Sequence, residues 1–126
     1  MSVFTKLKLK NILLVDDDEW IRDSMTLLFE GEGCRLSSFE TAEEAIKALQ
    51  EKPYDIVITD YKLPGMNGLK FLKFIAANYP NTIKVLITAY GSEDVISRAK
   101  QIPVNDIIKK PFTSAIIERS LSQLVG

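Results

Sequence analysis

The stretch ILLVDDD, residues 12–18, joins an apolar run directly to three consecutive carboxylates. A short apolar run bounded by polar residues is typical of a buried β-strand. The carboxylates of Asp16, Asp17 and Asp18 repel one another at neutral pH, so the fold needs a partner that offsets this cost. The stretch therefore predicts a buried strand that opens onto an acidic cluster.

Further apolar runs alternate with segments of helical spacing along the rest of the chain. The other expected strands cover residues 35–39, which form the weakest run, and residues 56–59, 83–88 and 107–108. A helix is expected after each strand. The first ends at Gly31–Gly33, the second begins at the Thr41/Glu44 capping box and the third begins near Gly68. The fourth covers about residues 93–101, and Thr113 or Ser114 caps the fifth.

Strands that are apolar on both faces and joined by helices predict a parallel sheet covered on both sides. With 126 residues, 46% of them hydrophobic and 26% charged, the chain is expected to form a single doubly wound α/β domain of the (βα)5 type over residues 1–126. Residues 1–9 are interpreted as an N-terminal lead-in. Ligands of such folds bind outside the carboxyl ends of the strands.

The composition excludes several classes of function. A net charge of -1 offers no general attraction for nucleic acid or an anionic membrane. The apolar run after Lys10 is too short for a signal peptide and no segment is long enough to span a bilayer, so we expect a cytoplasmic protein. The chain has no histidine and one cysteine, Cys34, which excludes the usual zinc sets and leaves Cys34 as a small buried hydrophobe. Any metal must be held by oxygen, which favours Mg²⁺.

Chemically useful side chains stand at the ends of four expected strands, namely Asp16 with Asp17, Asp60, Thr88 and Lys110. Each alone could be a helix cap or a solvated loop residue, but together at one sheet edge they favour a metal site. A carboxylate such as Asp60 beside Mg²⁺ can attack a phosphoryl group, with Lys110 and Thr88 contacting the phosphoryl oxygens. Asp18 and Glu19 are interpreted as first-turn residues of the next helix.

Four pieces of the chain, ILLVDDD, DIVITDYKLPGMNG, VLITAYG and IIKKPF, follow one another in the order and at the spacing of a known family. From Lys10 to Val125 the chain resembles a response-regulator receiver domain, the phospho-acceptor part of bacterial two-component signalling. The resemblance implies a flavodoxin-like sheet in the order 2-1-3-4-5. It also implies a module that promotes only its own phosphorylation and dephosphorylation, not an enzyme that turns over an external substrate.

The resemblance implies roles for single residues. Asp60 would accept a phosphoryl group from the phosphohistidine of a histidine kinase or from a phosphotransfer protein, and Thr88 and Lys110 would hold that group. The Lys110–Pro111 peptide bond would be cis.

The implied cofactor is Mg²⁺, for which Mn²⁺ can substitute. Asp17 and Asp60 would coordinate it directly, and Asp16 would act through a metal-bound water. The backbone carbonyl of Lys62 would be a further ligand. The Lys62 side chain is interpreted as a solvated loop lysine, with reach over the site as the alternative.

The resemblance also implies that phosphorylation changes the conformation of the domain, and two positions bear on how a partner would detect this change. Ile107 stands where many receivers carry Tyr or Phe, and an isoleucine cannot follow the threonine in the way that this aromatic side chain does. Tyr90 either takes over part of the readout or is a surface aromatic over the pocket mouth. The expected partner is a downstream protein or an output domain outside this sequence, with a phosphorylation-dependent homodimer as a further alternative.

Three other functions fit parts of the sequence. A Mg²⁺-dependent hydrolase with an aspartyl nucleophile would need a second acid/base group and a substrate-covering cap, for which no insertion is long enough. A flavodoxin-like FMN binder would need a Ser/Thr/Gly-rich first loop in place of Asp16–Asp18. A constitutive binding module would not need the acidic set.

Overall fold

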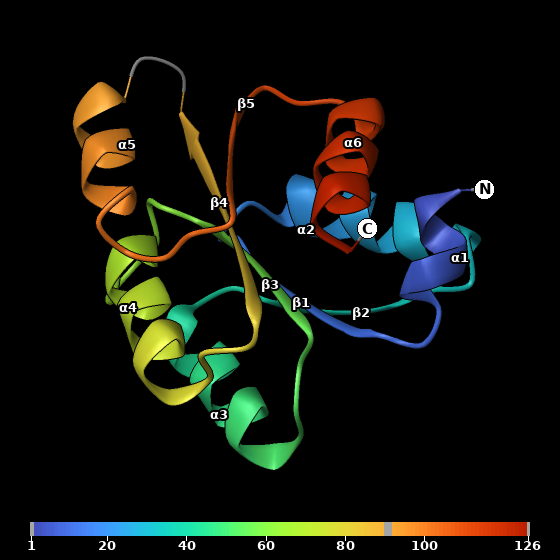
Figure 1. Ribbon diagram of the computed structural model, residues 1–126, viewed down its shortest axis with the longest axis horizontal. Coiled ribbons are helices and arrows are strands. Elements are labelled where there is room, and N and C mark those ends of the chain that lie inside the picture. The colour runs from blue at the N-terminus through green and yellow to red at the C-terminus, as the bar shows by residue number, and fades with distance from the viewer. Residues whose placement is uncertain (1, 90–91, 126) are drawn as a thin grey trace.

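The computed structural model describes residues 2–89 and 92–125, and its centre is a parallel sheet (Figure 1). The five strands lie in the order β2-β1-β3-β4-β5, which confirms the doubly wound, flavodoxin-like fold. The strands are β1 (Asn11–Val15), β2 (Arg35–Phe39), β3 (Ile56–Asp60), β4 (Ile83–Ala89) and β5 (Asp106–Lys110).

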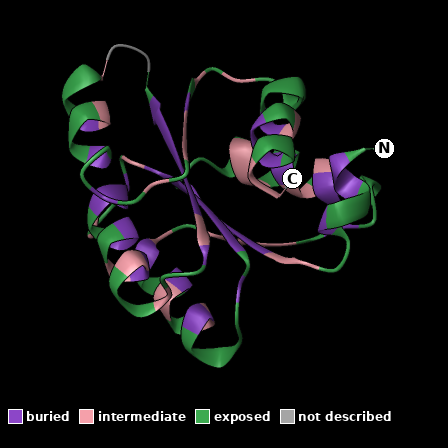
Figure 2. Cartoon of the chain, viewed as in Figure 1, coloured by how far each residue is buried: buried purple, intermediate pink, exposed green. Residues whose placement is uncertain are grey.

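Helices cover both faces of this sheet (Figure 1). They are α1 (Val3–Leu7), α2 (Glu19–Gly31), α3 (Ala42–Glu51), α4 (Gly68–Asn78), α5 (Glu93–Ala99) and α6 (Ser114–Val125). One core cluster packs α3, α4 and α5 against the sheet, and the other packs α1, α2 and α6 against the opposite face. Figure 2 shows the result, with buried residues along the central strands and exposed residues on the outer sides of the helices.

Local signals in the sequence explain where several helices begin and end. The capping box at Thr41 and Glu44 is present in both directions at the start of α3. Gly33, which follows the end of α2, has φ +76°, a left-handed conformation that glycine adopts without strain. Asp18 is the N-cap of α2, so it lies just before the first turn in which we expected it, and its side chain accepts the Trp20 N–H.

The expected lead-in over residues 1–9 contains a helix that the sequence analysis missed. The side chains of Val3, Phe4 and Leu7 are buried, and the ring of Phe4 meets Phe29 edge-on at 5.6 Å between centroids. The segment is too short to show a helical period in the sequence. Helix α1 therefore owes its place to packing against α6 and the C-terminal part of α2, not to a local signal.

Candidate functional site

The acidic residues meet because β1 and β3 are neighbouring parallel strands. Val15 pairs with Thr59, so Asp16 and Asp60 follow paired residues at the same edge of the sheet. Both aspartates are buried, whereas Asp17 is exposed at the rim. Single carboxylate oxygens of Asp16, Asp17 and Asp60 lie within 4.8 Å of one another.

Lys110, the last residue of β5, reaches into this acidic group. Its Nζ lies 3.1 Å from Oδ2 of Asp60 and 3.2 Å from Oδ2 of Asp16. Burial tends to lower the pKa of Lys110, but the charges of Asp16 and Asp60 outweigh it and raise the pKa above its ordinary value. Lys110 is therefore a fixed positive charge beside both carboxylates. The Lys110–Pro111 peptide bond is cis.

Both buried carboxylates hold their charge at a cost. Burial raises the pKa of Asp60, and the charge of Asp16 raises it further, although Lys110 and the Tyr61 N–H oppose this. Burial likewise raises the pKa of Asp16, against the Asp18 N–H and Lys110. A cation at this edge would remove the penalty in both cases.

One atom of the cluster indicates where a cation fits. Oδ1 of Asp16 accepts the backbone N–H of Asp18 at 2.9 Å, but the buried Oδ2 has no hydrogen-bond partner among the described residues. The 3.2 Å approach of Lys110 to that oxygen is an ion pair without hydrogen-bond geometry. An all-oxygen set with an unsatisfied carboxylate suits a hard cation such as Mg²⁺, which binds through few carboxylates and keeps several waters.

The acidic group opens into a cavity of about 650 Å³. Its lining includes Asp17, Asp60, Thr88 and Lys110 from the predicted set, together with the exposed Lys62. One expected residue from each of the four strand ends therefore lines this cavity, while Asp16 is not part of its lining. Tyr90 lies outside the described residues.

Helix α4 approaches the Asp60 backbone so closely that only glycine fits at its first position. A Cβ on Gly68 would lie 2.2 Å from the carbonyl oxygen of Asp60 and 2.9 Å from Cα of Tyr61. The Gly68 N–H donates to the Tyr61 carbonyl at 2.8 Å, and Asn67 caps the helix by accepting the Lys70 N–H. This contact sets the position of the loop that carries Lys62.

Three contacts around the site were missed by the sequence analysis. Nη1 of Arg22 donates to the backbone carbonyl of Asp16 at 2.7 Å and holds the start of the acidic loop. Nη2 of Arg98 donates to the Tyr61 hydroxyl at 3.0 Å, and the Thr88 and Ser92 hydroxyls lie 2.8 Å apart. Arg22 lies six residues after Asp16, one turn into the expected helix, and that spacing is a usable signal. Ser92 likewise lies close in sequence to Thr88, four residues after it, whereas Arg98 and Tyr61 are 37 positions apart and have no comparable local signal.

Ile107 packs against the core and has no polar group of the kind that a tyrosine at this position would carry. It is partly buried and packs against the cluster that contains Val95, Ala99 and Ile102. It pairs with Leu86 across β4 and β5. An aliphatic side chain in this place cannot exchange a hydroxyl hydrogen bond.

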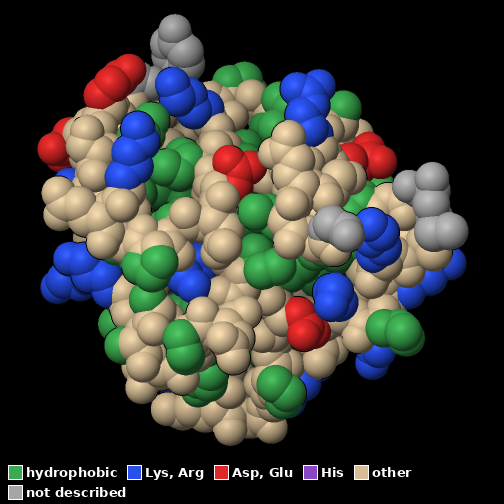
Figure 3. All heavy atoms as spheres, viewed as in Figure 1, with side chains coloured by type: hydrophobic (Ala, Val, Ile, Leu, Met, Phe, Trp, Pro, Cys, Tyr) green, Lys and Arg blue, Asp and Glu red, His purple; other side chains and the backbone are tan. Residues whose placement is uncertain are grey.

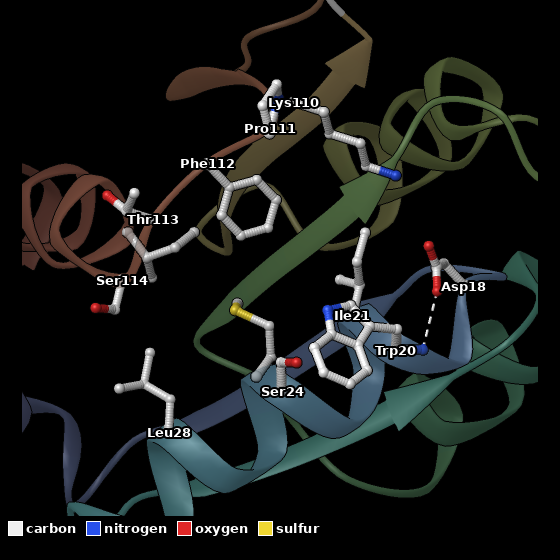
Figure 4. Close-up of a pocket in the computed structure, with 12 residues that line it drawn as sticks. Asp18, Trp20, Ile21, Ser24, Leu28, Lys110, Pro111, Phe112, Thr113 and Ser114 are labelled. Carbon is white, nitrogen blue, oxygen red and sulfur yellow. Dashed lines mark hydrogen bonds between the residues drawn. The ribbon is translucent and has the colours of Figure 1, made fainter.

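Two further hollows are distinct from the acidic cavity. An apolar groove of about 600 Å³ separates α2 from α6, with the 78% exposed Trp20 on its rim (Figure 4). Lys110 borders both spaces, and in Figure 4 its amine points away from Phe112. A smaller basic hollow between α4 and α5 includes Lys70, Lys73 and Arg98, on the side where Lys and Arg side chains gather over these helices in Figure 3.

No helix in the described parts of the chain is both long and apolar enough to cross a membrane. Residues 12–122 match the family described as the response regulator receiver domain.

Relatives and solved structures agree with this match. The chain is 32% identical to "Probable chemotaxis protein CheY" of Rhizobium etli, covering 100% of this chain and 98% of that protein. It is 34% identical to the DNA-binding transcriptional regulator NtrC of Proteus hauseri, covering 89% of this chain but 24% of the relative, so the chain spans about a quarter of the NtrC length. A CheY-like receiver domain structure from Methanospirillum hungatei has a TM-score of 0.87 at 27% identity, covering 93% of this chain and 94% of that one.

Receiver domains are signalling domains and not substrate-turnover enzymes, and a phospho-acceptor role in signalling is common to them. The matched residues, the strand order and the acidic group at the carboxyl edge lead to one conclusion: this chain belongs to the response regulator receiver domain family.

Proposed function

We propose that Asp60 accepts a phosphoryl group from the phosphohistidine of a histidine kinase or a phosphotransfer protein, and that the phosphorylated domain controls a downstream partner. The observation that carries this proposal is the position of Asp60, whose Oδ2 lies 3.1 Å from Lys110 Nζ and whose side chain opens to the cavity shared with Thr88. A carboxylate held beside a fixed positive charge is suited to receive a phosphoryl group, whose oxygens carry negative charge.

The transfer needs no redox partner and no external base. A carboxylate oxygen of Asp60 forms a bond to phosphorus while the bond from phosphorus to the imidazole nitrogen of the donor breaks, and the electron pair stays on that nitrogen. The product is an acyl phosphate on Asp60. Lys110 then holds the added phosphoryl oxygens by charge, and the Thr88 hydroxyl donates a hydrogen bond to them.

Asp17 and Asp60 would hold Mg²⁺ or Mn²⁺ directly, Asp16 would hold it through a water, and the Lys62 carbonyl would complete the protein ligands. When bound, the metal would neutralise the charge of the carboxylates and of the phosphoryl oxygens. Support comes from the 4.8 Å grouping of the three carboxylates and from the unsatisfied Oδ2 of Asp16.

The relatives indicate the kinds of downstream partner. One is named as a chemotaxis protein, 98% of which is covered by this chain, and another as a DNA-binding transcriptional regulator about four times as long as this chain. We propose that this domain acts on a separate protein or on an output domain, and that it does not itself bind nucleic acid, because its net charge is -1. The proposal includes a phosphorylation-dependent homodimer as an alternative mode of action.

The proposal is tested by intact-mass analysis after mixing the protein with acetyl phosphate, with and without Mg²⁺. We expect a gain of one phosphoryl group that requires Mg²⁺ and is absent in Asp60→Asn. The matched control is Asp23→Asn, an exposed aspartate on α2. No gain in the wild type, or the same gain in Asp60→Asn, would contradict the proposal.

A further inference from the structure

The hydroxyl groups of Thr88 and Ser92 are joined in a way that fixes the direction of their hydrogen bond. Their oxygens lie 2.8 Å apart, and Ser92 Oγ donates to the backbone carbonyl of Ala89. A serine hydroxyl has one hydrogen and a carbonyl oxygen can only accept. Thr88 is therefore the donor to Ser92, and its single hydrogen is not available to a group on Asp60 while this bond exists.

Ser92 also differs from the other N-cap residues. Ser2, Asp18, Thr41 and Asn67 have extended backbones, with ψ between 111° and 167°, and each side chain accepts a first-turn N–H. Ser92 is the N-cap of α5, but its ψ is 58° and its side chain makes no cap hydrogen bond. Serine is a preferred N-cap residue. Helix α5 therefore lacks the cap that its sequence supplies.

Helix α5 touches the phosphorylation site at a second point. Arg98 donates to the hydroxyl of Tyr61, the residue after Asp60, and its guanidinium lies 5.8 Å from the centre of the Tyr61 ring. Ile107, by contrast, offers this helix only apolar packing. The polar connections between α5 and the site thus run through Ser92 and Arg98.

We propose that Ser92 is a positioning residue that couples Thr88 to helix α5 by exchanging hydrogen bonds. This rests on the proposed phosphorylation of Asp60. When the Thr88 hydroxyl turns to a phosphoryl oxygen, Ser92 Oγ loses its donor, and it becomes the acceptor for the Val95 N–H as the backbone of Ser92 becomes extended. Phosphorylation then caps α5, and the ordered first turn of that helix carries the signal in place of a switching aromatic residue.

The experiment measures amide hydrogen exchange at Val95 before and after treatment with acetyl phosphate and Mg²⁺, with phosphoryl uptake followed by intact mass. In the wild type we expect exchange at Val95 to slow by about 3- to 10-fold, the size of a typical cap. Ser92→Ala should take up the phosphoryl group without this slowing, and Ser92→Thr, which keeps a hydroxyl, should restore it. Ser97→Ala, an exposed serine on the same helix, should behave as the wild type.

A second arm needs no phosphoryl group. Thr88→Val removes the donor, so Ser92 should cap α5 at once and slow Val95 exchange by a similar factor in the untreated protein, while Thr88→Val with Ser92→Ala should not. An unchanged Val95 rate in Thr88→Val, or full slowing in phosphorylated Ser92→Ala, would overturn the coupling. Absence of phosphoryl uptake in the wild type would instead contradict the proposed function. The Thr88→Val experiment would still test whether Ser92 exchanges its hydrogen bond from Thr88 for one from the Val95 N–H.

Discussion

The two ends of the sheet bury charge in different ways. At the carboxyl end, Lys110 lies within 3.2 Å of carboxylate oxygens of both Asp16 and Asp60. Near the amino end of β4, Lys84 is 3% exposed and its Nζ donates to the backbone carbonyl of Thr82 at 2.9 Å. Among the described residues, no carboxylate forms an ion pair with Lys84.

The difference shows that burial of a charge does not by itself indicate a functional site. Burial lowers the pKa of Lys84 with no charged partner to oppose it, whereas the carboxylates raise the pKa of Lys110. The carboxyl end gathers polar residues from β1, β3, β4 and β5 around one cavity, while Lys84 is a single buried group. Convergence of several strand ends distinguishes the carboxyl edge as the candidate functional site.

The largest expected effect comes from Gly68, which the carboxyl edge needs for its close contact with helix α4. Gly68→Ala places a Cβ 2.2 Å from the Asp60 carbonyl oxygen, against backbone that cannot move freely. We expect a loss of about 3 kcal/mol in the free energy of unfolding, measured by urea denaturation. Gly31→Ala is the matched control, because a Cβ added there would meet nothing within 4 Å, and it should be neutral or slightly stabilising. Equal effects at the two glycines would contradict this account of the edge.

Lys84 tests the other end of the sheet. Lys84→Met removes a buried charge while keeping the apolar chain, and we expect a gain of about 1–2 kcal/mol in the free energy of unfolding at pH 7. The pKa of Lys84 in the folded protein lies below its ordinary value of 10.5. The buried charge therefore destabilises the folded state fully at pH values below the folded pKa, and this destabilisation disappears as the pH rises towards 10.5. The gain should therefore shrink at alkaline pH. Lys47→Met, at an exposed position on α3, should show neither the gain nor its pH dependence.

Metal addition sharpens the comparison, because only the carboxyl end has oxygen ligands that face one another among the described residues. At Mg²⁺ ten times its dissociation constant, we expect about 1.4 kcal/mol of stabilisation, seen as a higher Tm. Asp17→Asn should remove most of this shift. Asp18→Asn should retain it, because Asp18 is an N-cap and asparagine caps as well. A shift that survives Asp17→Asn, or is lost in Asp18→Asn, would place the metal elsewhere.

The smallest effect is expected from neutralising Asp60 without metal. Burial and the charge of Asp16 raise the pKa of Asp60, so the charged form destabilises the fold above the folded pKa. Asp60→Asn should add about 1 kcal/mol at pH 7 in metal-free buffer, or a few degrees in Tm. The advantage should fade as the pH falls through the folded pKa towards 3.8, the ordinary value. A destabilised Asp60→Asn would mean that the Lys110 contact outweighs the burial of the charge.

Much of the fold could be predicted from local patterns. The runs at residues 12–15 and 56–59 correspond to the buried strands β1 and β3, and the capping box at Thr41 starts α3 as expected. Apolar periodicity and cap residues act over a few neighbouring positions, so they can be recognised in the sequence alone. The gathering of Asp16, Asp60, Thr88 and Lys110 followed from the same patterns, because parallel strands bring their carboxyl ends to one edge.

Only the tertiary structure determined which residues far apart in the chain are in contact. Lys110 and Asp60 are separated by 50 positions, and Arg98 and Tyr61 by 37. The burial of Lys84 depends on how helices cover its strand, and the need for glycine at Gly68 depends on how near α4 comes to β3. Local periodicity sets which face of an element is apolar, but the partner of a polar side chain depends on packing between elements, which no local pattern encodes.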